Sequence, residues 1–188
     1  MKNIGKFILG RKQSMTQIFN KDGIVVPATI VEISPIEVTA IKTKEIDGYT
    51  AIQINSKKGK IKVKKEYRTD DNSKKIGDSI DMSIFKEGDE IEVSAISKGK
   101  GFQGVVKRHG FGGGPRSHGQ KHSEREPGSI GGGLRNKVPK KMRMAGRMGG
   151  DRITVKNLKI VHIDTALNTM YISGAIPGRR GTLIEIKG

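Results

Sequence analysis

Cysteine and tryptophan are absent from this sequence, and aromatic residues make up only 4% of its 188 residues. Without cysteine the chain forms neither disulfides nor thiolate metal sites, which fits a reducing compartment. Hydrophobic residues amount to 34%, so any core must be small. Long apolar runs are missing too. The N-terminal stretch has three consecutive apolar residues, Phe7 to Leu9, whereas a secretory signal needs roughly 7–15 and a membrane helix about 20. We therefore expect a soluble, cytoplasmic protein.

Positive charge, in contrast, is abundant. The chain has 36 Lys and Arg against 19 Asp and Glu, which gives a net charge of +17. Such a charge is costly to hold in one compact body unless a polyanion neutralises it. Nucleic acid is the leading candidate for that polyanion, and an anionic membrane comes second.

Residues 1–96 have the pattern of β structure. The stretch that ends in Asp22 and Gly23 lies between two apolar runs and predicts a hairpin, and Asp47 with Gly48 predicts a second one. Pro27, inside an otherwise good strand, predicts an edge or a bulge.

Two further stretches of this part alternate with period two. Residues 61–63 are highly charged around their apolar positions and predict an exposed strand or loop. Residues 87–96 place Ile91, Val93 and Ala95 on one face, which predicts a half-buried strand.

The β pattern stops at Ser97 and resumes at Ile153. Many short strands with Gly-rich turns predict a mainly β fold, a small barrel or sandwich. Because strands are expected on both sides of the gap, we predict one β-barrel domain from residues 1–96 and 153–188. Residues 97–152 would then be a long irregular basic extension inserted in it, and loops of that length are usually functional or disordered.

The segment 97–152 has an unusual composition. It holds 15 of the 26 glycines and 14 Lys and Arg, against three acids. Apolar residues are too sparse for it to fold alone. Glycine lets the backbone approach a partner closely, while Arg and Lys side chains meet phosphates. The pattern favours a chain that threads between RNA helices. A disordered basic tail would have the same composition, but here barrel strands are expected at both ends.

A glycine motif in this segment raises the possibility of a nucleotide site. Residues 99–104 match G-x-G-x-x-G, which in a dinucleotide site follows a strand and begins a helix. The run that follows breaks at Gly110, too early for that helix. The H-R-D and D-F-G motifs of a protein kinase do not occur.

Metal, catalytic and membrane sites also have candidates here. His118 and His122 are four residues apart, a spacing that suits two metal ligands on a helix. Gly119 opposes a helix there, and contacts with RNA suit these imidazoles better. Ser117 and Ser123 lie near histidines, but no nucleophile, base and orienting group stand together. Residues 140–149 could form a short amphipathic membrane helix, which their glycines oppose. We predict no catalytic residue, metal, cofactor or small-molecule substrate.

Five blocks of the sequence resemble the universal large-subunit ribosomal protein L3 family, bacterial type. They are residues 10–19, 97–109, 127–131, 142–149 and 174–178, and they occur in the family's order. The resemblance implies a barrel related to those of translation factors, on the outer face of the large subunit. It also implies an extension that runs through rRNA toward the peptidyl-transferase centre.

The same resemblance implies the function. Proteins of this family are structural and make no catalytic contribution of their own; they bind 23S-type rRNA near its 3′ end and act early in subunit assembly. The implied partners are large-subunit rRNA and neighbouring large-subunit ribosomal proteins, with no membrane. Relatives often carry more sequence around residues 57–79. Some carry a methylated glutamine that has no counterpart between Ser129 and Gly149 here.

We accordingly predict the residues that bind RNA and the glycines that allow close backbone approach. The predicted RNA-binding residues are Arg11, Lys12, Lys98, Lys100, Phe102, Lys107, Arg108, His109, Arg116, His118, Lys121, His122, Arg125, Arg135, Lys137, Lys140, Lys141, Arg143, Arg147 and Arg152. The predicted glycines are Gly99, Gly101, Gly104, Gly128 and Gly131. A DNA-compacting protein is an alternative with the same charge, and an RNA-modifying enzyme would need a catalytic pocket that the sequence does not indicate.

Overall fold

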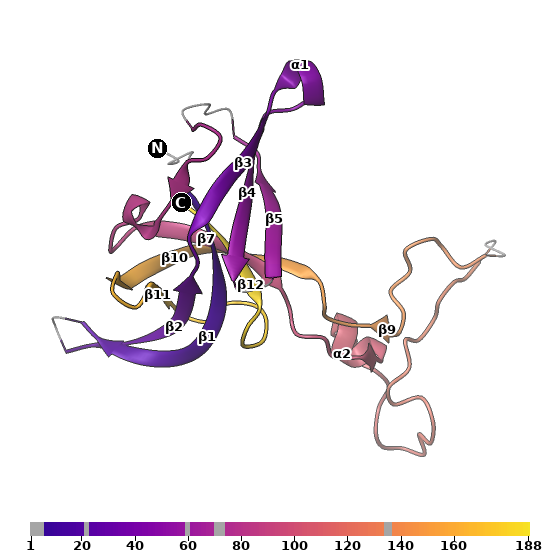
Figure 1. Ribbon diagram of the computed structural model, residues 1–188. Coiled ribbons are helices and arrows are strands. Elements are labelled where there is room, and N and C mark those ends of the chain that lie inside the picture. Colours follow the sequence, from indigo (N-terminus) through magenta and orange to yellow (C-terminus); the bar gives the residue numbers. More distant parts are fainter. Residues whose placement is uncertain (1–5, 21–22, 59–60, 70–73, 134–136) are drawn as a thin grey trace. The chain divides into compact units, whose positions relative to one another are not determined.

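The computed structural model describes residues 6–20, 23–58, 61–69, 74–133 and 137–188 (Figure 1). In chain order its elements are β1 (Phe7–Phe19), β2 (Val25–Ile33), β3 (Ile36–Lys42), α1 (Lys44–Asp47), β4 (Ala51–Lys58), β5 (Ile61–Tyr67), β6 (Ser79–Ile80), the 3-10 helix η1 (Met82–Ile84), β7 (Glu90–Ile96), β8 (Phe102–Gln103), α2 (Val105–His109), β9 (Gly146–Arg147), β10 (Arg152–Asp164), β11 (Thr169–Ser173) and β12 (Leu183–Lys187). The chain separates into two compact units: Met1–Ser97 together with Arg152–Gly188, and Lys98–Asp151.

A closed antiparallel barrel forms the centre of the first unit. Its strand order is β1-β12-β7-β10-β11-β2, and β2 closes it by pairing with β1. Strands from both ends of the chain lie side by side, since Phe7 pairs with Lys187. The fold is therefore mainly β, as predicted. At Gly10 in β1 there is no room for a side chain, because a β-carbon there would lie 2.5 Å from Val31 Cγ1.

The barrel is filled by small apolar side chains. Leu9, Val31, Val93 and Ile172 are fully buried in one continuous cluster, and each buried aliphatic side chain of this size contributes about 1.5–3 kcal/mol. The predicted alternation in β7 is confirmed, since Ile91, Val93 and Ala95 are all buried.

The two predicted hairpins are present. β1 and β2 are joined by a turn in which Gly23 N–H donates to the Asn20 carbonyl at 2.9 Å; residues 21–22 of this turn lie outside the described part. The second hairpin joins β3 to β4, but its connection is the helix α1, ended by Gly48 at φ 78°. Four residues are too short to show a helical period in the sequence.

Pro27 lies at an edge, as predicted. β11 pairs with β2 as far as Ala28, and at Pro27 the one bond on that side is from the Gly174 N–H to the Pro27 carbonyl, at 2.7 Å, while the ladder with β1 continues. The bulge in this region is in β1, between Lys12 and Met15.

A second sheet of order β5-β4-β3-β6 packs on the barrel within the same unit. Residues 61–63, predicted as an exposed strand or loop, form the start of β5. Tyr67 at the end of β5 stacks on Phe7 of the barrel with ring centroids 4.7 Å apart. Ile54 and Ile80 belong to the same hydrophobic cluster as the barrel interior.

Candidate nucleic-acid interface

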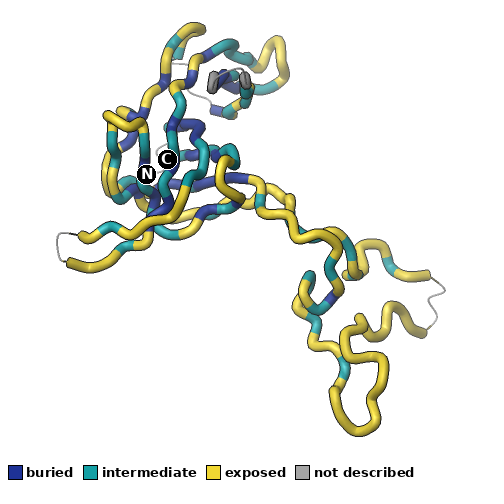
Figure 2. Tube along the Cα trace, turned by 60° about the horizontal axis from the view of Figure 1, so that its bottom comes forward, coloured by how far each residue is buried: buried dark blue, intermediate teal, exposed yellow. Residues whose placement is uncertain are grey.

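The unit Lys98–Asp151 has almost no hydrophobic core. Among its described residues, 98–133 and 137–151, Val105 is the one buried hydrophobic side chain. Figure 2 shows this part of the chain as mainly exposed. Its arrangement rests on backbone pairing and on a few side-chain contacts with backbone carbonyls.

The two ends of this unit run antiparallel in a short ladder that we call the neck, residues 98–103 and 146–149. Phe102 pairs with Arg147 across β8 and β9. The Lys100 N–H donates to the Met148 carbonyl, and the Met148 N–H donates to the Gly101 carbonyl, both at 2.9 Å. Gly149 completes the neck with φ 75°; a β-carbon on it would overlap the Lys98 carbonyl oxygen.

The helix α2 follows the neck. It has five residues and ends at Gly110, which adopts φ 74° and donates its N–H to the Val106 carbonyl at 3.0 Å. The prediction that the helix after the glycine motif is too short for a dinucleotide site is confirmed, because it ends at the predicted glycine.

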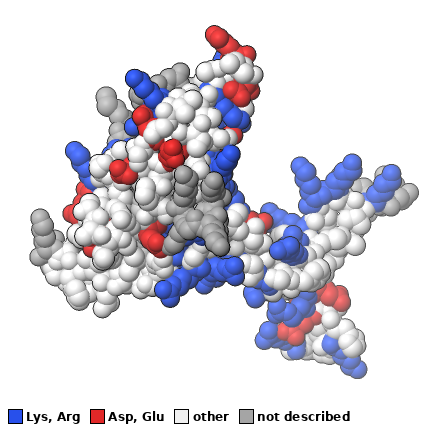
Figure 3. All heavy atoms as spheres, viewed as in Figure 1, with Lys and Arg blue, Asp and Glu red and all other residues white. Residues whose placement is uncertain are grey.

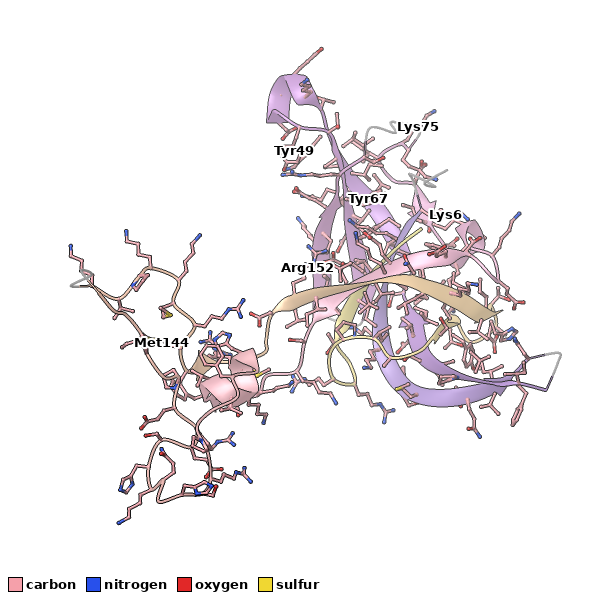
Figure 4. All side chains as sticks on the ribbon, turned by 180° about the vertical axis from the view of Figure 1, so that it is seen from behind. Lys6, Tyr49, Tyr67, Lys75, Met144 and Arg152 are labelled. Carbon is pink, nitrogen blue, oxygen red and sulfur yellow. The ribbon has the colours of Figure 1, made fainter. Side chains whose placement is uncertain are left out.

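Two side chains of α2 bind one backbone oxygen. Arg108 Nη1 donates to the Met144 carbonyl at 2.7 Å. His109 Nε2 lies 3.1 Å from the same oxygen, a hydrogen bond that requires the proton on Nε2. Figure 4 shows Met144 beside this helix. Both residues are half-buried, and their contacts tie α2 to the backbone at Met144.

A second loop closes further along the unit. The Gly114 N–H donates to the Glu124 carbonyl at 3.0 Å, and Arg116 Nε lies 2.5 Å from Glu124 Oε1. His118 and His122 lie on this irregular loop, where His118 adopts φ 59°, so they are not on a helix that would present both to one metal ion.

Cationic side chains cover this unit. In Figure 3, Lys and Arg side chains (blue) are numerous on the face of it that is in view. The predicted RNA-binding residues that the structure shows as exposed within it are Lys98, Lys100, Phe102, Lys107, Arg116, His118, Lys121, His122, Arg125, Lys137, Lys140, Lys141, Arg143 and Arg147. Phe102 differs from the other residues of this set because its side chain is apolar and aromatic, and it is 77% exposed.

Three predicted residues belong to the barrel unit, where they have partners of their own. Lys12 Nζ donates to the Ile176 carbonyl at 2.5 Å and to the Gly178 carbonyl at 3.1 Å. Arg11 Nη1 donates to the Gly181 carbonyl at 3.2 Å, and Arg152 forms an ion pair with Glu185. Arg135 lies outside the described residues.

The predicted glycines have open space around them. A β-carbon on Gly99, Gly101, Gly104, Gly128 or Gly131 would meet no heavy atom of this chain within 4 Å. That any of them approaches RNA stays a prediction.

The glycines that lie close to another main-chain segment of this chain are not among the predicted ones. They are Gly113 and Gly114, against residues 123–124, and Gly149, against Lys98. No sequence signal separates these glycines from their neighbours, because their partners are main-chain atoms that every residue has.

Two other features bear on the class of site. Over the described residues, no group of three or more His, Asp or Glu side chains is placed to hold a metal ion. No helix in those residues is long and apolar enough to cross a membrane.

Comparison with known proteins gives a consistent result over the whole chain. The family model of ribosomal protein L3 matches residues 39–175. The large ribosomal subunit protein uL3 of Herpetosiphon aurantiacus is 44% identical, over 95% of this chain and 94% of the relative. The uL3 proteins of Finegoldia magna and Bacillus cytotoxicus are 42% and 40% identical, each over 97% of this chain and 97% and 96% of the relative.

Proposed function

The chain belongs to the ribosomal protein L3 family, and on that premise we propose that it is a structural constituent of the large ribosomal subunit that binds 23S-type rRNA. The family is one of ribosomal proteins and not of enzymes. We further propose that binding occurs near the 3′ end of the rRNA early in assembly, and that the unit Lys98–Asp151 extends toward the peptidyl-transferase centre. The chain then acts in the cytoplasm, within the ribosome.

One observation carries the proposal: exposed cations are concentrated on a unit that has almost no core. The exposed cations of this unit repel one another, and an anionic partner that neutralises them lowers this repulsion. RNA supplies phosphates at close spacing, and each one that is neutralised releases a condensed counterion. Ordering such a segment is then driven by the partner rather than by apolar burial.

The local backbone geometry supports RNA as the partner. In the neck and in the loop closed by Gly114, two main-chain segments run close together, because Gly113, Gly114 and Gly149 occupy the points of closest approach. Arg125, Arg143 and Arg147 are exposed, and their guanidinium groups can form bidentate hydrogen bonds with phosphate. Such contacts position a protein on RNA without reading sequence.

The structure separates two roles among the predicted cations. Arg108 is half-buried with its guanidinium on the Met144 carbonyl, so we assign it the role of shaping the unit. Lys121, Lys137 and Lys140 are exposed, and we assign their ammonium groups to binding phosphates.

The test compares two triple variants of equal charge. The first carries Lys121→Gln, Lys137→Gln and Lys140→Gln in the unit Lys98–Asp151. The control carries Lys44→Gln, Lys75→Gln and Lys86→Gln, three exposed lysines of the barrel unit. Affinity for a large-subunit rRNA fragment is measured over a range of salt concentrations. Each lost phosphate contact reduces the magnitude of the slope of log affinity against log salt by about 0.7 to 0.9. We therefore expect a reduction of roughly 2 to 3 for the first variant and little change for the control.

Equal slopes for the two variants would contradict the assignment of binding to the unit Lys98–Asp151. A duplex DNA of equal length serves as competitor in the same assay. If it displaces the rRNA fragment at equal concentration, the chain is a general polyanion binder of the DNA-compacting kind, and the proposed specificity for rRNA fails.

A further inference from the structure

The hairpin of β1 and β2 extends beyond the end of the barrel. β12 pairs with β1 only as far as Arg11, and β11 pairs with β2 only as far as Ala28. Residues 15–19 and 25–27, which we call the ribbon, are therefore paired with each other alone over the described ladders, apart from the Gly174 N–H bond to the Pro27 carbonyl. In Figure 2 the end of this hairpin is mostly exposed.

The strand register divides the apolar side chains of the ribbon between its two faces: Ile18 and Val26, on the face of Thr16, are half-buried, whereas those on the other face are exposed. Met15 is opposite Thr29, Gln17 is opposite Pro27, and Phe19 is opposite Val25. Directly opposed residues point to the same face of an antiparallel pair, so Met15, Phe19, Val25 and Pro27 share one face, and Gln17 is its one polar member. Met15 is 51%, Phe19 64% and Val25 48% exposed.

This face continues the inner surface of the barrel. Alternate residues of β2 run from Val25 through Pro27 and Thr29 to Val31 and Ile33. Val31 and Ile33 are buried in the core, and Thr29 is buried as well. Because the bulge is in β1, β2 keeps its period of two throughout. Apolar side chains of a core pattern thus lie where the described residues leave them about half exposed.

The charge of the ribbon differs from that of the chain. Charged residues make up 29% of the sequence, yet residues 13–20 and 23–31 contain none. The two charges of the turn, Lys21 and Asp22, have opposite sign. A surface without cations has no means of neutralising phosphates. Exposed Met and Phe without charge match the fully buried centre of protein–protein interfaces instead.

We propose that the ribbon face of Met15, Phe19, Val25 and Pro27 docks against an apolar, uncharged surface of a neighbouring protein in the large ribosomal subunit. The neighbour supplies the layer that covers this face, as the opposite barrel wall does for Val31 and Ile33. The location in the large subunit rests on the proposed function, whereas the choice of protein over RNA rests on the ribbon.

The experiment uses a photo-activated cross-linker in assembled subunits. The amino acid p-benzoyl-phenylalanine replaces Phe19, large subunits containing the variant chain are purified, and they are irradiated. We expect a cross-link to one ribosomal protein, with the adduct on an apolar surface residue of that protein. The control carries the same amino acid at Thr16, which is exposed on the opposite face of the ribbon, and we expect at least tenfold less cross-link to that protein.

A pair of charge variants tests the same face without a probe. Val25→Lys adds a cation to the apolar face, and Thr16→Lys adds the same cation to the other face. We expect Val25→Lys alone to lower the amount of the cross-linked neighbour in purified subunits. The affinity of both variants for the rRNA fragment should equal or exceed that of the unchanged chain.

Several results would overturn the proposal. They are a cross-link from position 19 to rRNA, a cross-link to a second copy of this chain, equal yields from positions 16 and 19, or no cross-link in subunits that contain the variant. Failure of the unchanged chain to enter large subunits would instead refute the proposed function, and the docking proposal with it.

Discussion

Arg108 Nη1 donates a 2.7 Å hydrogen bond to the backbone carbonyl of Met144, which lies 36 residues further along the chain. His109 binds the same oxygen. These two contacts and the neck close the long loop at its base.

Replacing Arg108 should open this base. We expect Arg108→Gln to speed hydrogen exchange at the Met148 and Lys100 amides, which donate across the neck, by about tenfold. A tenfold change corresponds to about 1.4 kcal/mol, close to the lower end of the roughly 1.5–3 kcal/mol that a hydrogen bond to a charged group contributes. Lys107→Gln removes the same charge from an exposed side chain of the same helix and should leave those amides unchanged. Equal exchange in both variants would show that the Met144 contact does not hold the neck.

Gly149 and Gly150 offer a matched test of backbone crowding. Both adopt φ 75°, so alanine at either position carries the same left-handed strain, about 1 to 2 kcal/mol. A β-carbon on Gly149 would also overlap the Lys98 carbonyl, whereas one on Gly150 meets nothing within 4 Å. We expect Gly149→Ala to abolish protection of the Lys100 amide and to weaken rRNA binding, and Gly150→Ala to do neither. Similar effects of the two variants would mean that backbone strain matters here and crowding does not.

Phe102 should contribute to RNA binding in a way that salt does not weaken. An exposed aromatic ring among cations suits stacking on an unpaired base, worth about 1–3 kcal/mol per base. We expect Phe102→Ala to lower affinity for the rRNA fragment about tenfold, with the salt slope unchanged because no cation is lost. Phe102→Tyr keeps the ring and should restore affinity. A tyrosine variant as weak as the alanine variant would rule out stacking.

The Lys6–Asp89 pair should make the stability of the barrel unit depend on acid. The Lys6 ammonium donates to Asp89 Oδ2 at 2.6 Å, and the Lys86 N–H donates to it at 3.0 Å. Both hydrogen bonds lower the pKa of Asp89 from its ordinary value of 3.8. A carboxyl whose pKa is lower in the folded than in the unfolded chain stabilises the fold above the unfolded value, and this stabilisation is lost as the pH falls through the folded value.

We therefore expect Asp89→Asn to be less stable than the unchanged chain at about pH 6, and the difference to shrink at about pH 2.5. Urea unfolding at the two pH values measures it. Lys6→Gln should show the same trend with a smaller difference, since Asp89 keeps the Lys86 N–H. A difference that stays constant with pH would contradict the role of this carboxylate.

The β class of the fold was accessible from the sequence because its signals are local. Asp-Gly dipeptides predicted the hairpins at Gly23 and Gly48, and the period of two predicted the buried face of β7. The strands β8 and β9 were not predicted. Each has two residues, too few to show a period, and their pairing depends on tertiary contact.

The candidate site was predictable in its chemistry but not in its internal roles. Charge alone marked the cations of residues 97–152. It did not separate exposed Lys107 from half-buried Arg108, because the partner of Arg108 is a main-chain carbonyl. The same holds for Lys12, whose ammonium binds the carbonyls of Ile176 and Gly178 far along the chain.

The position of β12 between β1 and β7 has a consequence for folding during synthesis of the chain. A chain grows from its N-terminus, so the strand Leu183–Lys187, which fills that gap, is made after the other strands of the barrel. The cationic segment Lys98–Asp151 is made before β12, so it exists before the barrel is complete. A product cut short before Leu183 leaves β1 and β7 with open edges, which pair readily with other chains. Closure of the barrel thus follows synthesis of the cationic segment.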